Sequence, residues 1–326
     1  MKINSAYSHI ATMIGYFGGE ITKSYPKEAA FSDKKRKFAR TILEEMDFFY
    51  DLTHFGYLSN AFLAALLAGV VCGLVGTYIV SRRLVFLAGG VTHASFGGLG
   101  IAFYMGANPI LGAMLSAVAA AIGIEWASSR GRIREDSAIG IIWSIGMAIG
   151  VLFMSLRPGY TSGDLSAYLF GSIITVTRGD LIALALLTLG VVIGAIFWLR
   201  PIMYVAFDRE FARSRNIPTR LISYLMAVVM ALTIVLSIRI MGIVLLLSLI
   251  TMPVVVANTL TKSYRHIIVV APLIAICCNT IGLIISYQWD VPPGAVIIFT
   301  LTIALIAVKL LTLCRKKTSR LDENPT

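Results

Sequence analysis

Residues 57–80 read YLSNAFLAALLAGVVCGLVGTYIV, a stretch of 24 residues that contains no charged side chain. A helix rises about 1.5 Å per residue, so this segment is long enough to cross the roughly 30 Å of hydrocarbon in a lipid bilayer. Apolar residues occupy every face of such a helix rather than one stripe, as expected where lipid or other helices surround it. The segment therefore predicts a transmembrane helix.

Eight more apolar stretches follow the first one, separated by short polar connections. We expect them to span the membrane at residues 84–106, 109–127, 137–156, 180–199, 220–238, 241–260, 267–286 and 292–313. A shorter apolar piece, residues 165–176, cannot cross and predicts a re-entrant or interfacial half-helix. Hydrophobic residues make up 57% of the chain and charged residues only 14%, which is unusual for a water-soluble domain. The fold class is therefore an all-α, polytopic transmembrane helix bundle with about nine spans.

The Lys and Arg residues in the connections and the tail are distributed unevenly between the two sides of the membrane. If residues 165–176 do not cross, sixteen fall on one side and only Arg157, Arg178 and Arg239 on the other. The sixteen are Arg82, Arg83, Arg130, Arg132, Arg134, Arg200, Arg209, Arg213, Arg215, Arg220, Lys262, Arg265, Arg315, Lys316, Lys317 and Arg320. Because positive residues favour the cytoplasmic side, we expect the carboxyl terminus inside and the amino terminus outside. The net charge of +11 thus reflects topology, and no nucleic-acid partner is indicated.

The chain divides into three regions. Residues 1–56 form an amino-terminal arm, in which Thr41–Tyr50 mixes apolar, aromatic and acidic residues as an amphipathic helix on the membrane surface would. A disordered arm fits this composition equally well, and the arm lacks the pattern of a cleavable signal peptide. Residues 57–313 form the transmembrane domain, and residues 314–326 form a basic cytoplasmic tail.

The cysteines lie within or at the ends of apolar stretches, which does not fit a secreted disulfide framework. We expect free thiols at Cys72, Cys277, Cys278 and Cys314. Adjacent helical residues point about 100° apart, so Cys277 and Cys278 are not placed to chelate one ion. Together with the mid-span Asn279, they are expected to serve packing.

The segment GGVTHASFGGLG, residues 89–100, places His93 near the middle of the second span. An ionisable residue at this depth is costly unless it faces the bundle interior, pairs with another group or lines a pathway. Imidazole is also a common ligand of zinc, copper and iron. Small residues surround the histidine on the helix, so another helix or an ion can approach it closely. These residues are Gly89, Gly90, Gly97 and Gly98.

We therefore expect His93 to line the path of a cation. The competing interpretation is a packed histidine that hydrogen-bonds to Ser or Thr on a neighbouring helix. A single histidine is not a complete metal site, so any ion would need further ligands. Glycines in the first span, Gly69, Gly73 and Gly76, are expected to serve close helix packing.

The connection between the fifth and sixth spans reads FDREFARSRNIPTR from residue 207 to residue 220. Asp208 and Glu210 precede Arg213 and Arg215, an order that suits the helix dipole and predicts a short surface helix, which an Asn and a Pro then end. This connection is the best candidate for docking a cytoplasmic partner, and a solvated connector would show the same charge pattern. The residues concerned are Asp208, Glu210, Ala212, Arg213, Asn216 and Pro218.

The sequence carries no signature of an enzyme. It contains no Gly-rich phosphate loop that ends in Gly-Lys-Ser or Gly-Lys-Thr, and no His-Glu-x-x-His helix. A membrane enzyme such as an intramembrane metalloprotease would need two or three clustered ligands and a general base. Any ATP hydrolysis must therefore belong to another chain.

Several short motifs, taken in order, resemble the membrane permeases of bacterial ABC importers for zinc, manganese and iron. They begin at Val80, Thr92, Arg134, Tyr168, Asp208, Gly242, Met252 and Pro292 and read VSRRLVF, THAS, REDSAIGI, YLFGSI, DxExA, GIVLLL, MP and PPGA. Each motif is weak alone, but their order and spacing over residues 57–313 make the set specific.

The resemblance implies a transported divalent metal ion, with no bound cofactor. It implies a homodimer or pair of permeases in the cytoplasmic membrane with a path along the two-fold axis. It also implies a pair of cytoplasmic ABC ATPases and an extracytoplasmic metal-binding protein. The connection around Asp208–Pro218 would be the coupling helix that rests in a groove of the ATPase.

One position departs from the family pattern. Family members usually carry an aspartate four residues before the histidine, so that carboxylate and imidazole share one helix face; here that position is Gly89. His93 then needs a ligand from another helix or from its symmetry mate, or the cargo is coordinated differently. A permease for a chelated metal or a vitamin would explain the missing carboxylate. A stand-alone secondary transporter usually shows intramembrane carboxylates, and Glu125 is the only acid within an expected span apart from Asp180, the first residue of the span at 180–199.

Overall fold

The computed structural model describes residues 50–52, 54–129, 134–156 and 176–322, with side chains to residue 314. The chain divides into two units, residues 1–50 and 51–326, and the second unit contains all the helices discussed below. The predicted surface helix at 41–50 and the predicted half-helix at 165–176 lie, apart from their last residues, outside the described residues.

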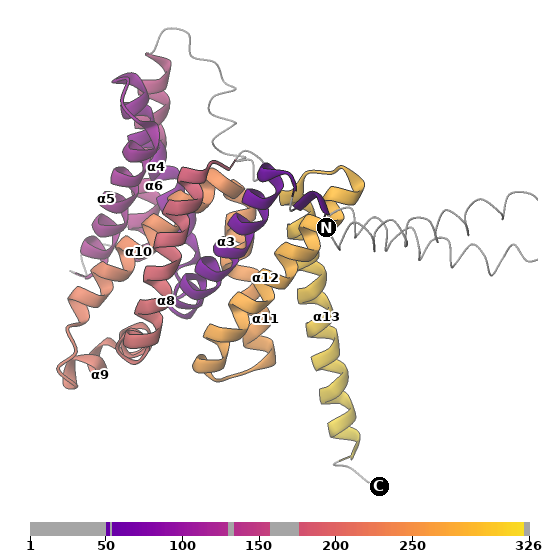
Figure 1. Ribbon diagram of the computed structural model, residues 1–326. Coiled ribbons are helices and arrows are strands. Elements are labelled where there is room, and N and C mark those ends of the chain that lie inside the picture. The colour runs from indigo at the N-terminus through magenta and orange to yellow at the C-terminus, as the bar shows by residue number, and fades with distance from the viewer. Residues whose placement is uncertain (1–49, 53, 130–133, 157–175, 323–326) are drawn as a thin grey trace, which may run out of the picture. The chain divides into compact units, whose positions relative to one another are not determined.

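The described part of the chain is built from helices (Figure 1). They are α3 (Gly56–Ser81), α4 (Val85–Tyr104), α5 (Pro109–Ser129), α6 (Glu135–Ser155), α8 (Arg178–Phe207), α9 (Arg209–Ser214), α10 (Thr219–Met241), α11 (Ile243–Leu260), α12 (Tyr264–Trp289) and α13 (Pro293–Asp322). Within these residues, nine helices are long and apolar enough to cross a bilayer: all except α9, with α13 counted to Cys314. The predicted all-α, polytopic bundle is confirmed.

The spans differ in how deeply the bundle buries them. In the most apolar window of each helix, 67% of α3 and 72% of α4 are buried, but only 11% of α8 and of α13. α3 packs against α8, α11 and α12, whereas α4 lies between α5 and α6. α3 and α4 therefore form the interior of the unit, and α8 and α13 present long apolar faces to lipid or to another chain.

Glycines in α3 allow neighbouring backbones to come into direct contact. A Cβ added at Gly73 would lie 2.6 Å from the Cα of Pro272 in α12, and one added at Gly76 would collide with the carbonyl oxygen of Ile250 in α11. About two turns away from Gly73, Asn279 Nδ2 donates to the carbonyl oxygen of Ala65 over 2.8 Å. Small residues and an interhelical hydrogen bond are the usual means by which helices associate in lipid.

Two helices extend beyond their predicted ends. α8 continues to Phe207 because the helix bends rather than stops: Pro201 lacks an N–H for the carbonyl of Phe197, and the intervening Trp198 takes non-helical angles (φ −115°, ψ 15°). The backbone of α13 stays helical to Asp322, through most of the predicted tail.

A single glycine joins α10 to α11. Gly242 has φ 78° and ψ 169°, a conformation that side chains with a Cβ essentially do not adopt, and its N–H still donates to Ile238. Close by, Arg239 Nη1 lies 2.6 Å from Asp180 Oδ1 at the start of α8. The chain thus reverses direction with almost no loop at this end of the bundle.

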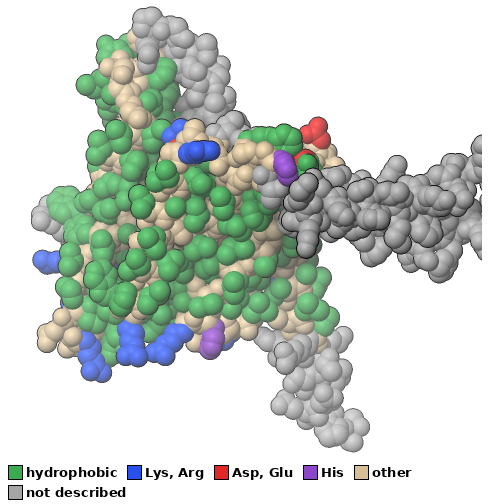
Figure 2. Space-filling view, viewed as in Figure 1, with side chains coloured by type: hydrophobic (Ala, Val, Ile, Leu, Met, Phe, Trp, Pro, Cys, Tyr) green, Lys and Arg blue, Asp and Glu red, His purple; other side chains and the backbone are tan. Residues whose placement is uncertain are grey.

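At the opposite end, helix termini that are distant in sequence lie close together. The side chains of Arg82 after α3, Glu125 in the last turn of α5 and Arg209 at the start of α9 are ion-paired, and Phe207 packs edge-on against Tyr264 at 5.5 Å. Figure 1 places α9 and the carboxyl-terminal end of α13 at this end. In Figure 2, the Lys and Arg side chains visible on this face gather mainly along the same edge.

Candidate functional site

His93 lies in α4, where it faces α6. Its ring stacks on the indole of Trp143, with centroids 4.3 Å apart and an interplanar angle of 8°. Its Nδ1 atom lies 3.4 Å from the Sδ atom of Met147, one turn further along α6. The histidine remains half-buried, and Trp143 is 37% exposed, so the pair lies at an open face of the unit. The structure thus gives His93 partners from a second helix.

The glycines around His93 let α6 approach. A Cβ at Gly97 would lie 3.1 Å from the carbonyl oxygen of Gly146, and one at Gly90 would lie 2.5 Å from the Cγ2 of Ile139. Gly98 faces the other way, where a Cβ would collide with Gly112 of α5. These small residues therefore allow α4 to pack closely against both α5 and α6.

At Gly89, an indole takes the place of the expected carboxylate. A Cβ added there would lie 3.6 Å from the Cζ3 atom of Trp143, so the ring covers the helix face on which an aspartate would stand beside His93. The ring of Trp143 fills the space that the small residue at position 89 leaves next to the histidine.

The contacts of His93 limit its chemistry. Within the described residues, no three His, Cys, Asp or Glu side chains come together as a metal site. The imidazole contacts a thioether and two aromatic rings, those of Trp143 and Phe96, rather than a Ser or Thr hydroxyl. Both groups are uncharged; imidazole suits zinc, copper, iron and nickel, and a thioether is a soft ligand, whereas Mg²⁺, Ca²⁺ and manganese prefer oxygen ligands. A complete site would need further ligands from the cargo itself or from another chain.

The predicted short helix in the connection after α8 is present as α9, Arg209–Ser214. Asp208 is its N-cap: one carboxylate oxygen accepts from the N–H groups of Glu210 and Phe211, both at 2.9 Å. Asn216 has a left-handed φ of 57°, and Pro218 precedes α10, so the chain leaves the helix as predicted. Ala212 is fully buried, whereas Arg213 and Glu210 are exposed.

Glu125 is enclosed by cations at this end of the bundle. Its Oε1 accepts from Arg209 Nη2 at 2.7 Å, and its Oε2 lies 3.4 Å from Arg82 Nη1. The same guanidinium lies 3.7 Å from Glu135 at the start of α6 and 3.2 Å from the Tyr78 hydroxyl. Burial lowers the pKa of Arg82, but Tyr78 and the two carboxylates raise this pKa by a larger amount. The net pKa lies above the ordinary value for arginine, so Arg82 stays charged. Glu125 therefore has its charge balanced inside the protein and is not a free intramembrane carboxylate.

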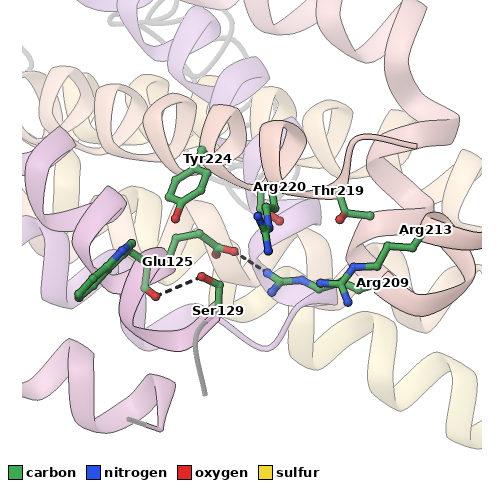
Figure 3. A pocket seen from close by; sticks show the side chains of 9 residues that line it. Glu125, Ser129, Arg209, Arg213, Thr219, Arg220 and Tyr224 are labelled. Atoms are coloured by element: carbon green, nitrogen blue, oxygen red, sulfur yellow. Dashed lines mark hydrogen bonds and ion pairs between the residues drawn. The ribbon is translucent and has the colours of Figure 1, made fainter. Parts of the chain in front are cut away.

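A cavity of about 260 Å³ opens beside this cluster (Figure 3). Residues of α5, α9 and α10 line it, and the close-up shows the arginines around the carboxylate of Glu125. The lining residues are Glu125, Trp126, Ser129, Arg209, Arg213, Thr219, Arg220, Ser223 and Tyr224. α9 thus lines a cavity, and its contacts with the bundle are made chiefly by side chains.

Comparison with known proteins identifies the family. The model of the ABC 3 transport family matches residues 54–312, which is most of the chain. The chain belongs to the ABC 3 transport family. The matched range covers all nine spans, the His93 contact and α9, and it leaves out most of the amino-terminal arm.

Individual relatives of this ABC 3 permease agree with the family. The manganese transport system membrane protein of Halalkalibacterium halodurans is 32% identical over 78% of this chain and 88% of its own length. A protein of Chlamydia muridarum named "Probable metal transport system membrane protein" is 35% identical over 76% of this chain and 86% of its own. In the solved structure of PsaBC from Streptococcus pneumoniae, one chain superposes with a TM-score of 0.71 at 25% identity, covering 81% of this chain and 94% of that one.

Several residues of the site were missed in the sequence. Trp143 and Met147 lie in an ordinary apolar stretch and give no signal of their own, because only the α4–α6 contact brings them to His93. Glu125 did give a signal: an acid in the last turn of a transmembrane helix has to be paired. Its partners, Arg82 and Arg209, were counted only as topology markers.

Proposed function

We propose that this ABC 3 permease carries a divalent transition metal ion, zinc, manganese or iron, across a bacterial cytoplasmic membrane, with His93 lining the path. The observation that carries the proposal is the His93–Met147 contact at an exposed face of α6. It supports the proposal because imidazole is a common ligand of zinc and iron, both residues belong to expected spans, and relatives in the family include a manganese system.

In this proposal ATP is hydrolysed by a separate cytoplasmic ABC ATPase, on which α9 rests as the coupling helix. Four features of α9 support this role: a capped, rigid start, an exposed charged face, a sharp exit and a position at the basic end of the bundle. The residues involved are Asp208, Glu210, Ala212, Arg213, Asn216 and Pro218. The basic end then faces the cytoplasm, with the carboxyl terminus inside and the amino terminus outside.

A second permease copy completes the path, and an extracytoplasmic metal-binding protein delivers the ion. The half-buried ring of His93 and the exposed face of α6 support a path on the two-fold axis, since one chain alone leaves the histidine without enough ligands. With two copies, two imidazoles and two thioethers would face the axis.

We expect ATP-dependent uptake of at least one of three ions when this chain, its ATPase and its binding protein are reconstituted in vesicles. Accumulation of radioactive manganese, zinc and ferrous iron is followed with ATP and with a non-hydrolysable analogue. The binding protein is loaded with one ion at a time.

Other outcomes of this experiment would identify a different function. Accumulation that needs an ion gradient but neither ATP nor the ATPase would mean a stand-alone secondary transporter. ATP-dependent uptake of a chelated metal or a vitamin, with none of the three free ions, would point to the alternative that the absence of a carboxylate at Gly89 raises.

The two-fold arrangement has its own test at Gly140, one turn before Trp143 on α6. A Cβ there meets nothing within 4 Å, so Gly140→Cys is tolerated and exposes a thiol. With the exposed Cys277 and Cys314 changed to Ser, we expect a bismaleimide to link two Gly140→Cys copies into a dimer on a denaturing gel. The matched control is Ile303→Cys on α13, which is also exposed (66%). Cross-linking at Ile303 and not at Gly140 would place the dimer contact on another face.

A further inference from the structure

The carboxylate of Glu125 holds the first residue of α9. Its Oε1 lies 2.7 Å from Arg209 Nη2, as Figure 3 shows, while only 5% of the Glu125 side chain and 29% of the Arg209 side chain are exposed. Within the described residues, no other ion pair involves α9. A charge-assisted hydrogen bond at this distance, with its carboxylate shielded from solvent, is among the stronger polar contacts in a protein.

Through Arg82, the other oxygen of Glu125 is linked to the start of α6 and to the connection that leads into α4. Oε2 lies 3.4 Å from Arg82, which ends α3 and stands three residues before α4 begins at Val85. Arg82 in turn lies 3.7 Å from Glu135, the first residue of α6. The line of charges thus runs from the start of α9 to the starts of α4 and α6.

Arg82 is shared between two acids without a close contact to either. Its guanidinium is 3.4 Å from Glu125 and 3.7 Å from Glu135, and Glu135 Oε1 is buried with no hydrogen-bond partner. Both distances exceed the 2.7–2.9 Å or so of a good charged hydrogen bond. A small displacement can therefore shorten one of the two contacts at the expense of the other.

We infer that Glu125 is a positioning residue that transmits displacement of α9 to α4 and α6, and so to the contact between His93 and Met147. The inference rests on the proposed function, in which the ATPase moves α9. When α9 moves and withdraws Arg209, Arg82 becomes the sole ion-pair partner of Glu125. The unbalanced carboxylate then attracts the guanidinium of Arg82 more closely. Arg82 then leaves Glu135, and the start of α6 loses its ion pair with the connection that leads into α4.

The experiment measures how many ATP molecules are hydrolysed per ion transported. The variants are Glu125→Gln and Arg209→Gln, reconstituted with the ATPase and the binding protein in vesicles. Coupling free energies between protein sites typically correspond to 5- to 150-fold effects, so we expect about fivefold or more ATP per ion in each variant. The double variant should be no worse than either single one, because the two residues act as one unit.

The control removes an ion pair of the same kind at the other end of the bundle. Asp180→Asn breaks the 2.6 Å contact with Arg239, and its ATP-per-ion ratio should remain at the wild-type value. A wild-type ratio in Glu125→Gln or Arg209→Gln would overturn the inference. If Glu125→Gln fails to fold in detergent, Arg209→Gln, whose side chain is partly exposed, decides the matter.

Failure of the inference can be told apart from failure of the proposed function. If the wild-type chain does not bind the ATPase or transport any ion, the proposed function is wrong. If wild-type transport is normal and the ATPase still co-purifies with every variant, only the ratio of ATP to ion tests Glu125. A merely structural role would lower the yield of folded protein and leave that ratio unchanged.

Discussion

Replacing His93 with Ala should reduce metal uptake to the level of vesicles without ATP. Loss of groups that merely support a metal ligand already costs about 10- to 100-fold, so loss of the ligand itself should cost more than about tenfold. The measurement is the initial rate of ATP-dependent uptake at saturating ATP. Co-purification of the ATPase shows that the variant still assembles.

His93→Phe separates a ligand from a packing residue. Phenylalanine can stack on Trp143 as the imidazole does, at 4.3 Å between centroids, but it has no ring nitrogen for an ion or for Met147. If the histidine is a ligand, His93→Phe should be as inactive as His93→Ala. Wild-type uptake by His93→Phe would mean that the ring serves only to hold α6 against α4. Met147→Leu, which keeps the volume but removes the sulfur, should show a smaller loss.

Gly73→Val should prevent folding of the bundle. A Cβ at this position would lie 2.6 Å from the Cα and 2.7 Å from the N of Pro272, so backbone rather than a flexible side chain would have to move. Overpacking typically costs about 1–3 kcal/mol and occasionally more, and we expect the upper end here because α3 and α12 cannot separate without losing their other contacts. The measurement is the yield of monodisperse protein in detergent and its thermal unfolding temperature.

Gly190→Val in α8 is the matched control for this substitution. A Cβ at Gly190 meets nothing within 4 Å in this chain, and valine is well tolerated in apolar surroundings. It should therefore leave the unfolding temperature near that of the wild type. An equally large loss for Gly190→Val would mean that bulk anywhere in these helices, and not the α3–α12 contact, causes the defect.

The fold was largely predictable because each span carries its own signal. Length and apolar composition fix where a helix crosses, and nine expected spans are the nine described ones. The ends were less predictable. The predicted span ended at residue 199, yet Pro201 only bends α8 at Trp198, and the helix continues to Phe207.

The sequence predicted those features of the candidate site that lie within a single helix, but not the contacts between helices. His93 and its glycines stand out within α4, and the capping residues of α9 can be read directly from their order. The stacking of Trp143, the sulfur of Met147 and the cations around Glu125 arise from contacts between helices, for which a single sequence gives no register. From the sequence, Gly89 indicated only that the aspartate usual in the family is absent. The structure adds that the indole of Trp143 lies where that side chain would stand.

The proposed path past His93 also has a consequence for the movement of charge. Trp143, Met147 and Phe96 carry no charge that could travel with the ion, so a divalent ion on this path would cross the membrane with its full +2. Each such ion moves two elementary charges through the membrane field, which is worth about 4.6 kcal/mol per 100 mV. With the cytoplasm negative, that energy favours entry and opposes return. In the proposed function, the cell's own voltage is therefore a second source of work beside ATP.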